Sequence, residues 1–187
     1  MATSLASLWL PILVSGVVLF FASWLAWMVI GHHKADWKTL PNEDQVTAMI
    51  RGGIQPGQYM FPNCPTAEEY KSEAFKEKMK TGPHGVLYVW GPDVNMGFNM
   101  LLTWLLFTAI SLVIAYLAGM VIPPKPNTDF WFVFRFVGTA GILVYATSGL
   151  LNAIWFRRRV IGDVIDGIAY GLITGLIFAA MWPGSGA

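Results

Sequence analysis

Four long apolar stretches occupy most of this 187-residue chain. They cover residues 5–31, 96–122, 129–156 and 160–182. The first three exceed the roughly 20 apolar residues that an α-helix needs to cross a bilayer, and the fourth just reaches that length. The overall composition agrees, because 55% of the residues are hydrophobic and only 12% are charged. We therefore predict an all-α membrane protein with four transmembrane helices.

Residues 32–95 separate the first two apolar stretches and hold most of the charged side chains. Turn and capping signals in this segment predict two short helices and one pair of strands. The helices are expected at residues 43–51, after an Asn42 cap, and at residues 67–80, after a Thr66–Glu69 capping box; the strands are expected at 58–61 and 85–90. The segment is thus predicted to be a small α/β insert between the first two transmembrane helices.

The orientation follows from the short connection between the third and fourth apolar stretches. It contains Arg157, Arg158 and Arg159, and short basic loops stay on the cytoplasmic side. This places the insert in the cytoplasm and both chain ends outside. The first apolar stretch has no basic residue before it and is longer than the core of a signal peptide, so we expect it to remain as a helix.

Composition also narrows the function. The net charge of +1 comes with no separate basic face, which argues against a nucleic-acid partner. Cys64 is the only cysteine, which excludes an intrachain disulfide and a zinc site built from thiolates. The sequence contains no nucleophile elbow, phosphate loop or dinucleotide fingerprint, so we predict no catalytic residue. This favours a non-enzymatic protein.

Small residues form a stripe along the last apolar stretch. Gly167, Gly171, Gly175 and Ala179 recur every four residues and therefore share one helix face. Such stripes let helix backbones approach closely in lipid. The stripe predicts packing against the first or third helix of the same chain; contact with another subunit and a substrate path are the alternatives.

Two carboxylates stand at the start of the same stretch. Asp163 and Asp166 are expected to complement the helix dipole and to pair with Arg157, Arg158 or Arg159. Tyr170 and Thr174 continue the Asp166 face. The alternative is therefore a short polar track that serves as a proton relay or cation site.

The third apolar stretch carries one charge inside its ends, Arg135, which lies five residues past Phe130. Arg135 is expected to reach the outer interface and contact Asp129 or a lipid phosphate; an inward, functional arginine is the alternative. Tyr145 and Asn152 lie on the Arg135 side and are expected to form hydrogen bonds between helices.

No histidine lies within an apolar stretch, so a haem buried in the membrane would lack its usual axial ligand. His32, His33 and His84 could in principle form a metal site with Asp36 and Cys64, but their spacing matches no metal motif. We expect them to be polar residues at the membrane interface, and we predict neither a metal nor a cofactor.

Several short motifs resemble a family of small bacterial inner-membrane proteins of uncharacterised function. They are the runs at residues 33–44 (HKADWKTLPNED), 56–62 (PGQYMFP), 82–83 (GP) and 134–139 (FRFVGT), with Asp166-Gly167-x-x-Tyr170. The resemblance implies four helices, a soluble insert after the first, and location in the bacterial inner membrane. It implies no activity.

The leading functional hypothesis is an accessory or scaffold subunit of a larger membrane complex, for instance an energy-transducing one. Its expected partners are the lipid bilayer and either other protein subunits or further copies of itself. Two alternatives stay open. One is a small channel or transporter that uses Asp163, Asp166, Tyr170, Asn152 and Arg135, and the other is a lipid-acting interfacial enzyme that uses the three histidines.

Overall fold

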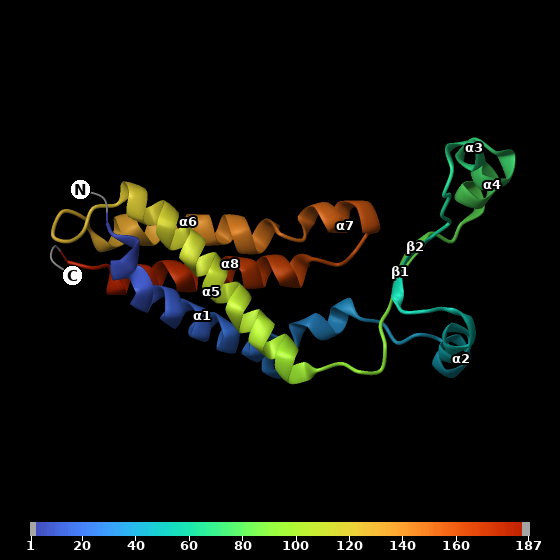
Figure 1. Ribbon diagram of the computed structural model, residues 1–187, viewed down its shortest axis with the longest axis horizontal. Helices are drawn as coiled ribbons and strands as arrows, with labels where there is room; N and C mark the ends of the chain where they lie inside the picture. The colour runs from blue at the N-terminus through green and yellow to red at the C-terminus, as the bar shows by residue number, and fades with distance from the viewer. Residues whose placement is uncertain (1–2, 185–187) are drawn as a thin grey trace. The chain divides into compact units, whose positions relative to one another are not determined.

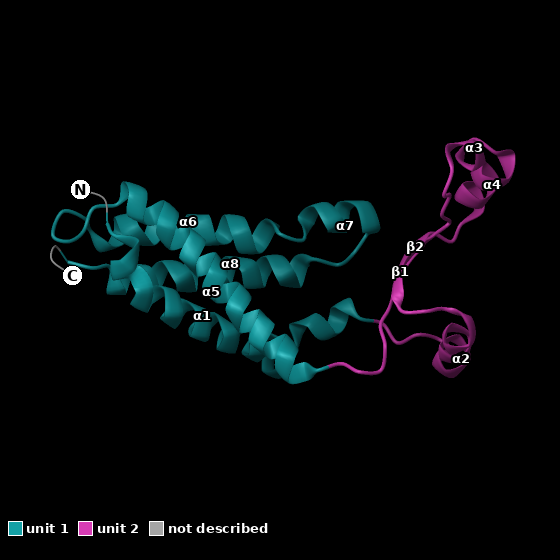
Figure 2. Cartoon of the chain, in the orientation of Figure 1, with its two compact units in different colours: residues 1–37, 95–187 teal, residues 38–94 magenta. Residues whose placement is uncertain are grey.

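The computed structural model describes residues 3–184 of the chain, which divide into two compact units. Unit 1 combines residues 3–37 with residues 95–184, and unit 2 is residues 38–94 (Figure 2). Unit 2 begins at Lys38 rather than at residue 32. His32 and His33 therefore belong to the helical unit and not to the insert.

Unit 1 is built from long helices (Figure 1). They are α1 (Trp9–Trp24), α5 (Met96–Val121), α6 (Phe130–Thr147), α7 (Leu150–Phe156) and α8 (Ile161–Met181). Four helical spans are long and apolar enough to cross a membrane. The first is α1 with the short helical turns on either side of it, the second is α5, the third is α6 followed by α7, and the fourth is α8. This confirms the predicted pattern of apolar helices and indicates a membrane-embedded protein.

Two of the predicted continuous helices are interrupted. The first apolar helix ends in a π-helical turn, Leu25–Ile30, and Gly31 then adopts a left-handed conformation with φ of +66°. Glycine adopts this conformation without the steric cost that a Cβ brings. The third helix breaks at Ser148-Gly149, between α6 and α7. The hydropathy pattern contains neither interruption, because both are changes in backbone geometry within apolar sequence.

Helices α6 and α8 make the most extensive contact in unit 1 and lie side by side (Figure 1). A Cβ added at Gly167 would lie 2.4 Å from the Cα of Ala146, and one at Gly175 would lie 2.9 Å from the Cα of Gly138. The small-residue stripe therefore packs against the third helix of the same chain, which is one of the two helices that its spacing predicted. Ala179, its last member, is also buried.

The core of unit 1 lies where α1, α5, α6 and α8 meet. Leu8, Ile114, Val133 and Phe178 are among its fully or almost fully buried side chains. A polar contact joins the ends of two of these helices, because Trp182 Nε1 donates to the carbonyl of Pro123 at 3.0 Å. Many large apolar side chains of these helices remain exposed, as expected of surfaces that face lipid.

Unit 2 contains short elements only. They are α2 (Glu43–Gly53), β1 (Gly57–Phe61), α3 (Ala67–Tyr70), α4 (Glu73–Thr81) and β2 (Gly85–Val89). The strands pair antiparallel, with Tyr59 opposite Leu87, which confirms the predicted strand pair. Two predictions were wrong. Asn42 has left-handed geometry and its side chain does not cap α2, and the second helix divides because Ser72 caps α4 anew.

Candidate functional site

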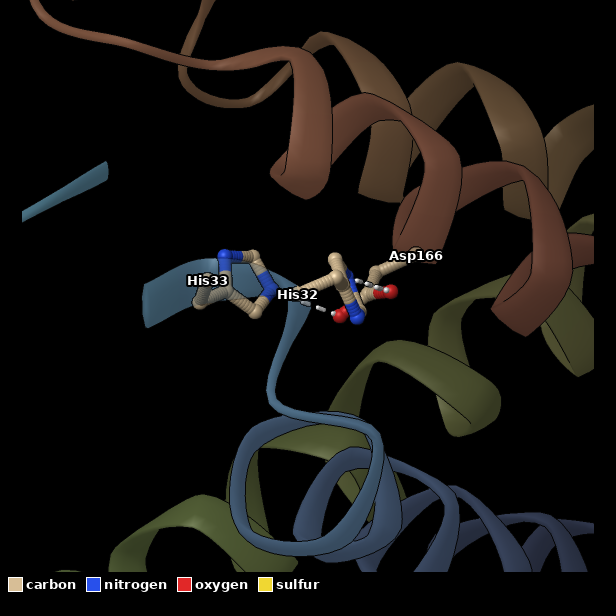
Figure 3. A group of neighbouring side chains, drawn as sticks. All are labelled: His32, His33 and Asp166. Carbon is tan, nitrogen blue, oxygen red and sulfur yellow. Dashed lines mark hydrogen bonds and ion pairs between the residues drawn. The ribbon is translucent and has the colours of Figure 1, made fainter. Parts of the chain in front are cut away.

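A cluster of ionisable side chains forms where the end of the first apolar helix meets the start of α8. His32 and His33 open a short 3₁₀-helix, His32–Asp36, directly after the Gly31 turn. Asp166 lies in the second turn of α8 and faces them (Figure 3). The Nε2 atom of His32 lies 3.0 Å from Oδ1 of Asp166, and Nε2 of His33 lies 3.0 Å from Oδ2. We call these three residues the His–Asp cluster.

The His33 side chain is buried among contacts from Asp36, Trp27 and α8. It is only 4% exposed, and its Nδ1 lies 3.2 Å from Oδ2 of Asp36. The indole of Trp27 stacks on its ring, with centroids 4.0 Å apart and the planes within 11° of parallel. A Cβ at Gly162 would lie 2.8 Å from Cε1 of His33. The ring can therefore reach α8 only because residue 162 carries no side chain.

The electrostatic surroundings favour a charged His33. Burial lowers its pKa, but hydrogen bonds to Asp166 and Asp36 and the charges of Asp166 and Asp163 outweigh burial, so the pKa lies above the ordinary value of 6.5. Both ring nitrogens face carboxylate oxygens, and an imidazolium can donate to both at once. In the protonated form, His33 is a buried cation between two carboxylates.

The short polar track considered as an alternative for α8 is present in its first half. The hydroxyl of Tyr170 donates to Oδ2 of Asp166 at 3.1 Å, whereas Thr174 donates to the backbone carbonyl of Tyr170. Beyond it, the buried hydroxyl of Tyr145 lies near the hydroxyls of Ser111 on α5 and Thr174 on α8, so the predicted bond from Tyr145 to another helix stays a prediction.

The carboxylate–arginine pairing was half right. Asp163 pairs with Arg158, as expected. Asp166 instead contacts the two histidines, because the Gly31 turn carries them over the start of α8. Arg159 Nη1 donates to the carbonyl of Ala35 at 2.5 Å. Arg157 is exposed and ends α7 with a φ of +50°.

Arg135 and Asn152 do not join the cluster. Nε of Arg135 donates to the carbonyl of Trp131, one turn back on α6, at 3.2 Å, and the side chain is exposed. Asp129, its predicted partner, instead caps α6 through the amide of Phe132. Asn152 is exposed on α7 and makes no hydrogen bond between helices in the part of the chain that the structure describes.

A groove of about 900 Å³ runs beside the cluster, between α1, α5, α6 and α8. Its wall is mostly apolar and includes Trp24, Trp27 and Phe107. Asp163 and Asp166 line it together with Arg158. The groove therefore offers charged groups beside an extended apolar surface.

Sequence reasoning missed the role of His32 and His33, although a signal for it existed. The predicted topology places the end of the first helix and the start of the fourth at the same membrane face. The histidine pair and Asp166 could therefore have been expected near one another. Of the other members of the metal site considered from sequence, Asp36 contacts His33, whereas His84 and Cys64 lie in unit 2 and outside the cluster.

Similarity to known proteins supplies no family and no activity. No family model, curated protein or solved structure matches the chain. A function for this chain must therefore be inferred from the geometry of its described residues.

Proposed function

We propose that the protein is a non-enzymatic, multi-pass membrane protein that serves as an accessory or scaffold subunit of a larger membrane complex. The four apolar helices cross the bacterial inner membrane in this proposal, with unit 2 in the cytoplasm and both chain ends outside. One observation carries it: none of residues 38–94 has a buried side chain. A folded unit of this size normally covers an apolar core of its own.

The two-stranded sheet is the part of unit 2 that we expect a partner to cover. Met60 and Val86 are directly opposite each other on one face, and Tyr59 and Leu87 are opposite each other on the other. Tyr88 is 50% exposed and Met60 53%. An isolated pair of strands is only marginally stable in water. Because both faces of this sheet carry apolar side chains, a partner that buried them would stabilise it. A protein subunit that packs on this sheet would supply the missing core.

The proposed orientation is supported by charge and by contacts. Arg157, Arg158 and Arg159 lie in the short connection before α8, where basic residues mark the cytoplasmic side. The contact between Arg159 and Ala35 joins this connection to the segment that leads into unit 2. The Thr3 hydroxyl donates to the carbonyl of Ile122 at 2.7 Å. This bond places the start of the chain at the C-terminal end of α5, which is the end farther from unit 2 along the chain.

Purification of the full-length protein in a mild detergent tests this function. We expect a second protein to co-purify in a fixed ratio, because the sheet needs a cover. Tyr88→Ser should weaken that association about tenfold, and the matched control Tyr70→Ser, an exposed tyrosine on α3, should leave it intact. Recovery of this protein without any other protein, with its sheet covered by a second copy or by lipid, would contradict the proposal.

A second candidate, a small cation channel or transporter, is favoured by the His–Asp cluster beside the groove. Of the five residues that the sequence suggested for transport, Asp163, Asp166 and Tyr170 come together, and the histidines join them. Ionisable side chains at membrane depth commonly mark ion pathways. Arg135 and Asn152 lie elsewhere and have no part in this candidate.

Cation flux into vesicles reconstituted with the protein distinguishes this second candidate. Asp166→Asn should abolish flux, because the amide removes the charge that faces the two histidines. Asp129→Asn is the matched control, since asparagine also caps a helix and residue 129 lies away from the groove. Equal flux through wild-type and Asp166→Asn protein, or no flux through either, would exclude this role.

A further inference from the structure

The His–Asp cluster brings together three good metal ligands from segments 133 residues apart. One ring nitrogen each of His32 and His33 and a carboxylate oxygen of Asp166 all lie within 4.8 Å of one another. Both rings stand beside the carboxylate, each with one nitrogen near one of its oxygens (Figure 3). A tetrahedral ion at about 2.0–2.2 Å from each ligand requires ligand atoms roughly 3.4 Å apart. Small side-chain movements achieve this spacing.

The groups behind these ligands have the arrangement that metal sites use. Histidine ligands usually donate their second ring nitrogen to a carboxylate, and ligating carboxylates are themselves hydrogen-bonded. Here Nδ1 of His33 lies 3.2 Å from Asp36, and the Tyr170 hydroxyl donates to Asp166 at 3.1 Å. Trp27 fixes the plane of the His33 ring by stacking. The two ligands that are most buried are thus already oriented.

The charge of the surroundings matches a divalent cation. Arg158 compensates Asp163, which leaves the carboxylates of Asp36 and Asp166 facing the two histidines. Metal ligation requires neutral imidazoles, so a bound ion takes the place of the His33 proton; the two carboxylates then carry a charge of −2, which a divalent ion neutralises. Asp166 is buried, and a buried carboxylate without a compensating charge is costly, so this neutralisation stabilises the folded protein.

His32 supplies an observation that a network of hydrogen bonds does not explain. Its Nε2 atom is inaccessible to solvent and has no hydrogen-bond partner among the described residues. It lies 3.0 Å from Oδ1 of Asp166, but the two groups do not meet in hydrogen-bonding geometry. A buried nitrogen without a partner costs free energy, and a bound ion would provide the partner.

We propose that His32, His33 and Asp166 bind one divalent first-row transition metal ion of the zinc and iron class at the membrane interface. Imidazole nitrogens favour these metals over magnesium and calcium, which prefer oxygen ligands. Three protein ligands leave further coordination positions for water. Asp36 and Tyr170 orient the ligands without binding the ion. This site is independent of the proposed accessory role and holds whether or not unit 2 binds a partner.

Metal titration of the full-length protein in detergent tests the site. The protein is purified without a polyhistidine tag, treated with a chelator, and titrated with Zn²⁺ by calorimetry and with Co²⁺ by visible absorption. We expect one ion per chain and ligand-field bands of a Co²⁺ site with nitrogen ligands. His32→Gln and Asp166→Asn should weaken binding about 100-fold or more, and Asp36→Asn should weaken it about 10–100-fold.

His84→Gln is the matched control, because His84 is the third histidine and lies in unit 2. It should leave affinity and stoichiometry unchanged. Size-exclusion profiles verify that each variant is folded, and His32→Gln decides the outcome if Asp166→Asn fails to fold, since His32 is 28% exposed. Absence of binding, or binding that His32→Gln leaves at wild-type affinity, would overturn the proposal.

Discussion

Replacing Gly171 with alanine is expected to lower the free energy of unfolding by about 3 kcal/mol. A Cβ at this position would lie 2.4 Å from the backbone nitrogen of Ile142 and 2.9 Å from the carbonyl carbon of Gly141. Because these are backbone atoms of α6, the added methyl group can be accommodated only if α6 and α8 move apart. The loss is measured by denaturant unfolding of the protein in detergent, followed by circular dichroism.

Gly97→Ala is the matched control for this experiment. Gly97 is also a helical glycine, but the nearest atom to its added Cβ is Asn95 Oδ1 at 3.6 Å, an ordinary contact. Alanine favours helix over glycine by roughly 1 kcal/mol, so this variant should be as stable as the wild type or more so. Equal stability of the Gly171 and Gly97 variants would show that α6 and α8 do not pack through their backbones.

Replacing Asp166 with alanine is expected to cost about 3 kcal/mol, the usual range for removal of one partner from a buried ionic pair. Asp166 is 7% exposed and accepts hydrogen bonds from His33 and Tyr170. Without its carboxylate, the ring nitrogen of His33 and the hydroxyl of Tyr170 remain buried and unpaired. The same unfolding assay measures the change, with chelator present so that no metal contributes.

Asp163→Ala provides the comparison, because Asp163 occupies the preceding turn of the same helix and pairs with Arg158, whose side chain is 57% exposed. A solvent-screened pair contributes little, so we expect a loss below about 1 kcal/mol. Similar losses for the two variants would indicate that the histidines do not contact Asp166 in the folded protein.

Several features were predictable because they are local properties of the sequence. Apolar runs long enough to cross a bilayer predict helices, and the four-residue spacing from Gly167 to Ala179 predicts a close-packed face. The pairing of β1 with β2 followed from turn signals on either side of each strand. The ion pair between Arg158 and Asp163 was equally predictable, because the two residues are only five positions apart.

The interruptions and the cluster were not predictable in the same way. The division of the last insert helix at Ser72 depends on a second N-cap inside a sequence that also suits one helix. The contact between His33 and Asp166 depends on three conditions together: the left-handed turn at Gly31, the missing side chain at Gly162, and the alignment of two helix ends. None of these conditions leaves a periodic pattern in the sequence.

The sequence by itself determined that hydrocarbon is the expected solvent for four helices, because a bilayer selects for length and apolarity, which any window of residues displays. It also determined which face of the last helix carries small residues. Only the tertiary structure decided which helix that face packs against and which side chains surround Asp166. The physical reason is that the energies of buried charges depend on distances of a few ångströms between segments far apart in the chain, and those distances are set by backbone turns and helix packing rather than by composition.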